Sequence, residues 1–451
     1  MRVNYRVMLA AAAGSVGVVL AVGVAFAPTA GAATAGTATA GTATARAATT
    51  EAATAGAATA RAATTGAGAT GAATAGAATA GATTAGAATA GAATTGAAAT
   101  GAATTGSGAH PSFVGGFKTI TTVGSTVPKN GDVNPYGVAV VTRSKDRLHK
   151  GDVLVSNFNN KANTQGTGTT IVEVAPNHAV RVFAQINAAR LPGACPGGIG
   201  LTTALAILGN DWVVVGSLPT VAGNPATSKA GCLLVLNSEG RVVETFHSHG
   251  INGPWDMTAV SKRGVSALFI TNVLNGTVAA GGKQVHRGTV LRLMVTTPER
   301  GLPRLLAATT IGSGFAEETN SSALVIGPTG VGLGGNGTLY VADTLGNRIT
   351  AIPNALLRHG SAGTGRTVTK NGAIRGPLGV AIAPGGDILA ANSLNGNLVE
   401  VTPSGRQVAV KTLDRSGSPA GAGALFGLAV APRGNGVYFV DDATNTLDLL
   451  H

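Results

Sequence analysis

The sequence has few of the residues from which most catalytic and metal sites are built. Its 451 residues include two cysteines, eight histidines and four methionines, and aromatic residues make up 4% of the chain. Neither cysteine has the spacing of a metal site or a histidine partner for nucleophilic chemistry. We also find no phosphate-binding glycine loop, no nucleophile elbow and no paired-carboxylate motif. The sequence therefore contains no motif that indicates one of these classes of enzyme or metal site.

Acidic residues are scarce as well, with 19 aspartates and glutamates against 31 lysines and arginines. Four of these arginines and one glutamate precede residue 111, which leaves 27 basic and 18 acidic groups beyond it and a net charge of +9. Such a charge suits anionic wall polymers or lipid headgroups. Because the basic residues form no run and no recognised nucleic-acid motif, we expect no nucleic-acid partner.

Residues 1–32 have the pattern of a secretory signal peptide. The opening MRVNYR carries two arginines, residues 7–27 are apolar and uncharged, and Ala30-Gly31-Ala32 supplies small residues for cleavage. The apolar run is long enough to span a bilayer, so an uncleaved anchor is the alternative. After cleavage we expect no stable membrane span, and a protein that is secreted or associated with the cell wall.

Residues 33–109 consist almost only of alanine, threonine and glycine, in motifs such as GAATA. This composition offers no large side chains to pack, and its glycines and threonines oppose a helix. We therefore predict a disordered tether that precedes a single folded domain of residues 110–451.

Both cysteines, Cys195 and Cys232, fall within the same repeat of the folded domain. In an exported chain this predicts a disulfide, and two free buried thiols are the alternative.

The folded domain repeats a short apolar pattern six times, at intervals of about 48 to 74 residues. The copies are YGVAVV at 136, TALAIL at 203, WDMTAV at 255, TGVGLG at 329, LGVAIA at 378 and FGLAVA at 426. A turn and two further strand-like segments follow each copy, and a fourth segment follows in five cases. Four short strands per repeat are typical of a propeller blade.

The sixth repeat lacks a fourth strand because the sequence ends at His451. Residues 116–123, GFKTITTV, have the length and alternation of the missing strand. Pairing them with residues 446–450 would close the ring and cover an exposed sheet edge. We therefore predict an all-β fold, a six-bladed β-propeller closed by an N-terminal strand. A sandwich or solenoid would leave the two ends unmatched.

The segment GPTGVGLGGNGTLYVADTLGNRI, residues 327–349, resembles an NHL repeat, and the copies around residues 377–401 and 426–447 are looser. The resemblance covers the whole propeller, and it indicates a fold more than a particular function. Propellers of this kind include binding scaffolds, lactonases resembling gluconolactonase, and amidating lyases. The lactonases place asparagine and aspartate just before the inner strand as calcium ligands, where this chain has Tyr136, Leu378 and Phe426, so we expect neither this metal site nor a cofactor.

One face of the ring should carry the loops between second and third strands, which are long in the first three repeats, and the residues that begin each inner strand. These residues include Tyr136, Trp255 and Phe426. Such aromatic side chains form either a stacking surface for a ligand or a core plug at the axis.

Polar residues recur where the second strands end: Asn157, Ser217, Asn272, Asp343, Asn392 and Asp441. Asn157 and Asn272 are candidate ligand contacts, although repetition in every blade favours a structural role in bonding loop backbone. Asp256 stands where most blades have glycine, and either contacts a ligand or caps a loop.

These observations predict a non-catalytic binding or interaction module that acts through the long-loop face. Its candidate ligand-binding residues are Tyr136, Trp255, Asp256, Phe426, Asn157 and Asn272. The expected partner is an extracellular glycan, wall polymer or protein. The alternative is an extracellular metal-dependent hydrolase or lyase of the lactonase-like type, in which Asp256 and the polar ring would act with a divalent ion.

Overall fold

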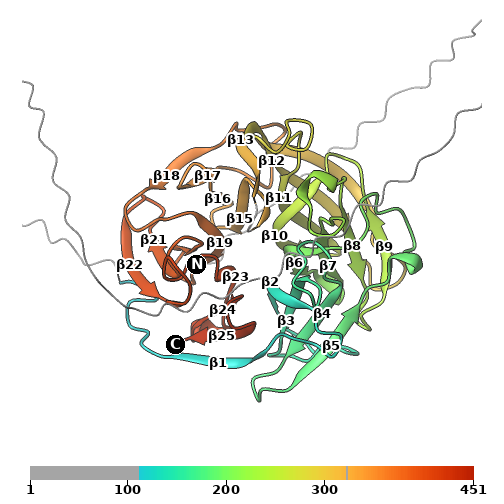
Figure 1. Ribbon diagram of the computed structural model, residues 1–451, viewed down its shortest axis with the longest axis horizontal. Coiled ribbons are helices and arrows are strands. Elements are labelled where there is room, and N and C mark those ends of the chain that lie inside the picture. Colours follow the sequence, from blue (N-terminus) through green and yellow to red (C-terminus); the bar gives the residue numbers. More distant parts are fainter. Residues whose placement is uncertain (1–110, 321–322) are drawn as a thin grey trace, which may run out of the picture. The chain divides into compact units, whose positions relative to one another are not determined.

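A computed structural model describes residues 111–320 and 323–451, which form six β-sheets arranged around a common axis (Figure 1). The predicted signal peptide and tether lie outside the described residues. Within the described residues, none of the helices has the length and apolar character needed to cross a membrane. The prediction of an all-β, six-bladed propeller is confirmed.

In five blades the strands pair in chain order with the first strand innermost, whereas the sixth blade takes its outermost strand from the start of the domain (Figure 1). The first three blades contain β2 (Val133–Val140), β3 (Val153–Asn159), β4 (Thr170–Val174) and β5 (Val180–Gln185); β6 (Leu201–Ile207), β7 (Val213–Ser217), β8 (Cys232–Leu236) and β9 (Val242–Phe246); and β10 (Gly253–Lys262), β11 (Val265–Val273), β12 (Val285–Thr296), β13 (Leu305–Asn320) and β14 (Leu324–Ile326).

The last three blades contain β15 (Pro328–Leu333), β16 (Leu339–Asp343), β17 (Arg348–Ile352) and β18 (Arg366–Lys370); β19 (Pro377–Ile382), β20 (Ile388–Asn392), β21 (Asn397–Val401) and β22 (Gln407–Thr412); and β23 (Leu425–Val430), β24 (Val437–Asp441), β25 (Thr446–Leu450) and β1 (Ile120–Ser125). Four short 3-10 helices lie in the connections: η1 (Ala188–Arg190), η2 (Gly209–Asp211), η3 (Pro225–Thr227) and η4 (Pro432–Gly434).

The ring closes as the sequence predicts. Strand β1 pairs antiparallel with β25, so that Ile120 lies opposite Leu450 and Ser125 opposite Thr446. In Figure 1 these two strands lie side by side although they come from opposite ends of the domain. The pairing covers the outer edge that β25 would otherwise expose.

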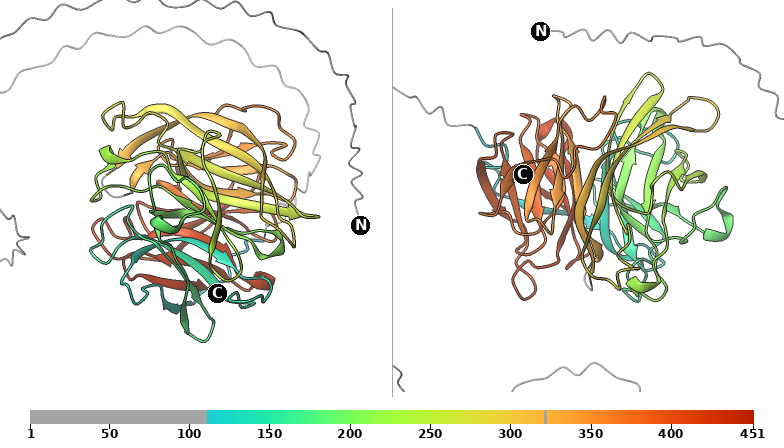
Figure 2. Two further views of the ribbon diagram at one scale, coloured as in Figure 1. Left: turned by 90° about the vertical axis from the view of Figure 1, so that its right-hand side faces the viewer. Right: turned by 90° about the horizontal axis from the view of Figure 1, so that it is seen from above.

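The third blade departs from the expected four short strands. Strand β13 is 16 residues long, and β14 pairs antiparallel with its end as a fifth strand, whereas the sequence predicts four short strands in this blade. The side views in Figure 2 show the long strands of this yellow to orange blade.

Apolar side chains fill the space between each pair of neighbouring blades. Between the first two blades, for example, Leu154 and Phe183 pack with Leu234, and all three are buried. Most second and third strands are buried along their whole length because both of their faces contact a neighbouring sheet. This packing fixes the inner strands around the axis.

The predicted disulfide is present and joins Cys195, in the segment before β6, to Cys232 at the start of β8. The bond is compatible with an extracellular protein.

Candidate functional site in the central channel

The aromatic residues that begin the inner strands meet at the axis, where they form a buried plug. We call Tyr136, Phe158, Trp255 and Phe426 the aromatic plug. The ring centroid of Tyr136 lies 4.0 Å from that of Phe426, 4.5 Å from that of Phe158 and 6.1 Å from that of Trp255. All four side chains are only 2–3% exposed. The arrangement is the core plug, and the expected stacking surface for a ligand is covered.

Two parts of the third and second blades cover this plug. Strand β14 lies over Trp255, whose Nε1 donates a hydrogen bond to the carbonyl of Val325 (3.0 Å). Leu218 and Leu274, at the starts of two of the long loops, belong to the same buried cluster. The remaining cavity at the plug has a volume of only about 10 Å³. The long-loop face is therefore closed at the axis.

Several polar residues at the ends of the second strands bond backbone that precedes an inner strand, whereas Asp343 and Asp441 accept from the turn that follows their own strand. Asn272 is the clearest case, since its Oδ1 accepts from the backbone N–H groups of Asn252 and Gly253 (2.8 and 3.0 Å), and its Nδ2 donates to the carbonyl of Gly250 (2.9 Å). The amide of Asn157 likewise donates to the carbonyl of Thr126 (2.8 Å). Both side chains are fully buried. Their role as ligand contacts stays a prediction; the observed partners are backbone groups and, for Asn272, also the side chains of Asn275 and Thr289.

Below the plug, the inner strands enclose a channel of about 310 Å³. Most of the side chains in its wall are apolar, although polar atoms make up the larger part of the accessible wall. The lining includes Val138, Leu205, Met257, Val331, Leu333, Val380, Ile382, Leu428 and Val430, with the side chains of Thr203, Asp256 and Thr258.

The channel opens at the end where the inner strands finish. Lining residues near the plug, such as Val331 and Val380, are buried, whereas Leu333 and Ile382 two positions further along are partly exposed. The opening therefore lies on the face that carries the loops between first and second strands. This face is opposite to the one for which the sequence predicted recognition.

Glycines let neighbouring inner strands approach closely around the axis. A Cβ atom on Gly330 or Gly379 would lie 2.0 Å from a backbone carbonyl oxygen of the next blade, and one on Gly427 would lie 2.2 Å from the carbonyl oxygen of Tyr136. Such distances exclude any side chain. In the third blade the same position is Asp256, so the fourth blade must leave room for a carboxyl group.

The carboxyl of Asp256 lies between the third and fourth blades, in the wall of the channel. Its Oδ1 accepts from the N–H of Met257 (2.8 Å), and its Oδ2 accepts from the N–H of Val331 (3.1 Å). Burial raises the pKa of this carboxyl from 3.8 to about 8, and the two backbone hydrogen bonds offset only part of that effect. The group therefore carries a proton at neutral pH.

This proton makes Asp256 a hydrogen-bond donor in a wall whose other polar side chains are threonines. Both observed hydrogen bonds of the carboxyl are accepted ones, and neither uses its O–H as the donor. Among the described residues that line the channel, Asp256 is the only ionisable one. The sequence pointed to this residue through its break in the glycine column, but it gave no sign that the channel opens on the opposite face.

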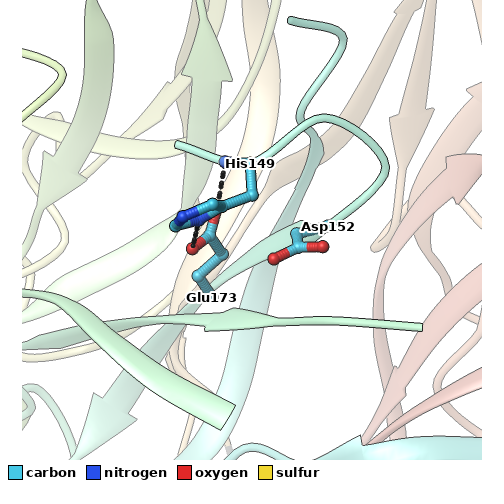
Figure 3. A group of neighbouring side chains, drawn as sticks. All are labelled: His149, Asp152 and Glu173. Atoms are coloured by element: carbon cyan, nitrogen blue, oxygen red, sulfur yellow. Dashed lines mark hydrogen bonds and ion pairs between the residues drawn. The ribbon is translucent and has the colours of Figure 1, made fainter. Parts of the chain in front are cut away.

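A second group of potential ligands, His149, Asp152 and Glu173, lies at the rim of the first blade (Figure 3). One ligand atom from each lies within 4.8 Å of the others, and His149 Nδ1 is 2.8 Å from Glu173 Oε2. Arg181, however, pairs with both carboxylates through its Nε and Nη2 atoms. This guanidinium already supplies the positive charge that the two acids need, so we interpret the group as an ion-pair network.

No family model matches the chain, and no curated protein matches its sequence. Solved structures with a similar fold include a gluconolactonase from Xanthomonas campestris (13% identity, 74% of this chain and 88% of that chain, TM-score 0.44) and the calcium-binding protein regucalcin from Agrobacterium tumefaciens (14%, 73% and 93%, 0.43). An inactive variant of virginiamycin B lyase from Staphylococcus aureus is another (14%, 74% and 98%, 0.41). At such identities the likeness concerns the fold alone and assigns no role to any residue of this chain.

Proposed function

We propose that this propeller binds a small, mainly apolar molecule in its central channel and holds one oxygen atom of that molecule through the protonated carboxyl of Asp256. The observation that supports this most directly is the position of the carboxyl, 8% exposed and in the wall of a 310 Å³ channel whose side chains are mostly apolar. Concave, mostly apolar sites with few polar groups are typical of small-molecule binding.

The chemistry of the wall restricts the ligand class. A neutral carboxyl donates to a carbonyl or ether oxygen, so a lactone, ester or ketone suits it below pH 8. Above that pH the group is a carboxylate in an apolar site, which would repel an ester oxygen and attract an ammonium group.

A second candidate function is hydrolysis or lyase chemistry on such a ligand, and the proton of Asp256 near neutral pH favours it. In lactone hydrolysis, water would add to the carbonyl carbon, the ring C–O bond would break, and Asp256 would give its proton to the departing ring oxygen. The added water would return a proton to Asp256. General acids work best when their pKa lies near the working pH.

The metal-dependent form of this alternative does not fit the residues of the channel. A calcium ion needs several oxygen ligands, and the positions at which lactonase-like propellers place asparagine and aspartate hold Tyr136, Leu378 and Phe426. Within the described lining, Asp256 is the only carboxylate. The ring-opening reaction described above therefore involves no metal ion.

Binding of matched ten-carbon probes tests the proposal. We expect δ-decalactone to bind about tenfold more tightly at pH 6.5 than at pH 9.5, because the carboxyl loses its donor as it ionises. Decylamine should show the opposite order. Isothermal titration calorimetry measures both, and chromatography of the lactone mixture shows whether the hydroxy acid is formed.

Two variants serve as controls. Asp256→Asn keeps a donor in the wall but cannot ionise, so the pH dependence of lactone binding should disappear, together with any ring opening. Ala381→Phe places a ring in the half-buried part of the channel wall near the opening and should block the binding of both probes. Lactone binding that is unaffected by Ala381→Phe would refute a site in the channel.

A further inference from the structure

The loops of the third and fourth blades on the face where the channel opens expose an unusually large share of the big apolar side chains. Eleven large hydrophobic residues are exposed in the described part of the chain, and five of them lie in these loops or at the adjoining strand ends. They are Val260 (39%), Leu302 (49%), Leu306 (58%), Leu356 (39%) and Leu357 (76%). We call these residues, with the basic residues among them, the blade 3–4 patch.

Hydrogen bonds show that the segments carrying the patch lie next to one another. Within the third blade, the N–H of Thr297 donates to the carbonyl of Gly264 (2.7 Å), which joins the turn after β10 to the turn after β12. Arg292 of β12 donates to the carbonyls of Ala355 and Leu356 (3.1 and 2.7 Å), which joins the third blade to the loop after β17. Both blades thus contribute to one surface.

Basic residues lie throughout the same loops. Lys262, Arg263, Arg300 and Arg304 are exposed, Arg358 is half-buried, and Glu299 is the only acidic residue of segments 260–264, 297–306 and 354–361. Exposed leucines among lysines and arginines suit a surface that offers both anionic groups and an apolar interior. Each basic residue near an anionic bilayer strengthens binding several-fold.

We propose that the blade 3–4 patch docks this propeller on an anionic lipid bilayer. The charge of the patch favours lipid over a second copy of the chain, because two copies would bring their arginines together. The proposal does not depend on ligand binding in the channel. The channel opens on the same face, however, so a docked molecule would present its opening toward the lipid.

The chain carries its own reporter of docking. It has two tryptophans, and Trp255 is buried in the aromatic plug. Trp212 is half-buried beside the patch, where its Nε1 donates to the carbonyl of Pro298 (2.9 Å). Bilayer docking should therefore quench Trp212 when the vesicles contain brominated acyl chains. A Trp255→Phe variant assigns the quenching to Trp212.

Co-sedimentation with vesicles tests the proposal. We expect binding to phosphatidylcholine vesicles that contain phosphatidylglycerol, little binding to pure phosphatidylcholine, and release at high salt. The double variant Leu302→Ser/Leu357→Ser should lower the partition coefficient at least tenfold. The control Val221→Ser/Leu394→Ser removes equally exposed side chains (68% and 59%) from the opposite face and should bind normally.

Charge variants complete the design. Arg263→Gln/Arg304→Gln should weaken binding to anionic vesicles about tenfold, whereas Arg190→Gln/Arg415→Gln, at exposed arginines of the opposite face, should not. The proposal is overturned by equal loss in the patch and control variants, by equal binding to neutral vesicles, or by no binding. Sedimentation that shows self-association through the patch, without lipid binding, would also overturn it.

Discussion

Replacing Asp256 with asparagine should change how the stability of the propeller depends on pH. Burial raises the pKa of this carboxyl in the folded state from 3.8 to about 8. Between these values the folded chain holds a proton that the unfolded chain has released. The unfolded state then binds fewer protons, so the free energy of unfolding falls as the pH rises. The contribution is complete below about pH 4 and is lost by about pH 8.

The expected magnitude follows from the same shift. Each pH unit within the window changes the free energy of unfolding by about 1.4 kcal/mol, so the wild type should lose about 2.7 kcal/mol between pH 5 and pH 7 through this group. The pKa values of Glu317, raised to about 7, and of Asp441, raised to about 6, add to the slope below pH 7. The difference between wild type and Asp256→Asn isolates Asp256.

Urea denaturation at several pH values measures this difference. Near pH 5 the variant should be less stable by about 1–3 kcal/mol, because its amide NH₂ cannot accept from both Met257 and Val331 as the carboxyl does. The two curves should cross between pH 5 and pH 8, because over that range the wild type loses about 3.7 kcal/mol through Asp256 whereas the variant loses nothing at this position. A constant difference between pH 5 and pH 9 would show that Asp256 is ionised in the folded protein and would refute its role as a donor.

Two further predictions concern the frame around the channel. Gly427→Ala should lower the free energy of unfolding by about 3 kcal/mol or more, because the new Cβ would lie 2.2 Å from the carbonyl oxygen of Tyr136. The control is Gly335→Ala, whose new Cβ would have no atom within 4 Å. In the same thermal melts this control should change stability by less than about 1 kcal/mol. Replacing both cysteines with serine should cost about 4 kcal/mol, because their disulfide closes a loop across 37 positions; a melt unchanged by the replacement would contradict this.

The sequence predicted the ring because the ring depends on local and repetitive features. Six copies of an apolar pattern mark six inner strands, and one unpaired strand at each end of the domain makes closure the physical solution. The fifth strand of the third blade was not foreseen. Residues 312–320 continue β13 and residues 324–326 pair with its end as β14, a pairing that depends on packing against the plug and leaves no periodic mark in the sequence.

The sequence predicted the candidate site only in part, because a repeat alignment does not show how deeply a side chain is buried. The repeat alignment placed Tyr136, Trp255 and Phe426 together at the axis, where they are. It could not show whether their rings face solvent or each other, because β14 lies outside the alignment and the position of Phe158, next to Asn157, gives no sign that its ring reaches the axis. Asp256 stood out because it replaces glycine, and its burial and pKa required the structure.

The most direct test of the central claim uses the channel wall itself. Because both native cysteines are joined in the disulfide, Ala259→Cys gives a single thiol in the half-buried part of the channel wall near the opening. We predict that a maleimide labels this thiol in the native protein and that δ-decalactone at pH 6.5 slows the reaction in proportion to its occupancy. Labelling at an unchanged rate, under conditions in which the lactone is bound, would place the ligand elsewhere and contradict the account.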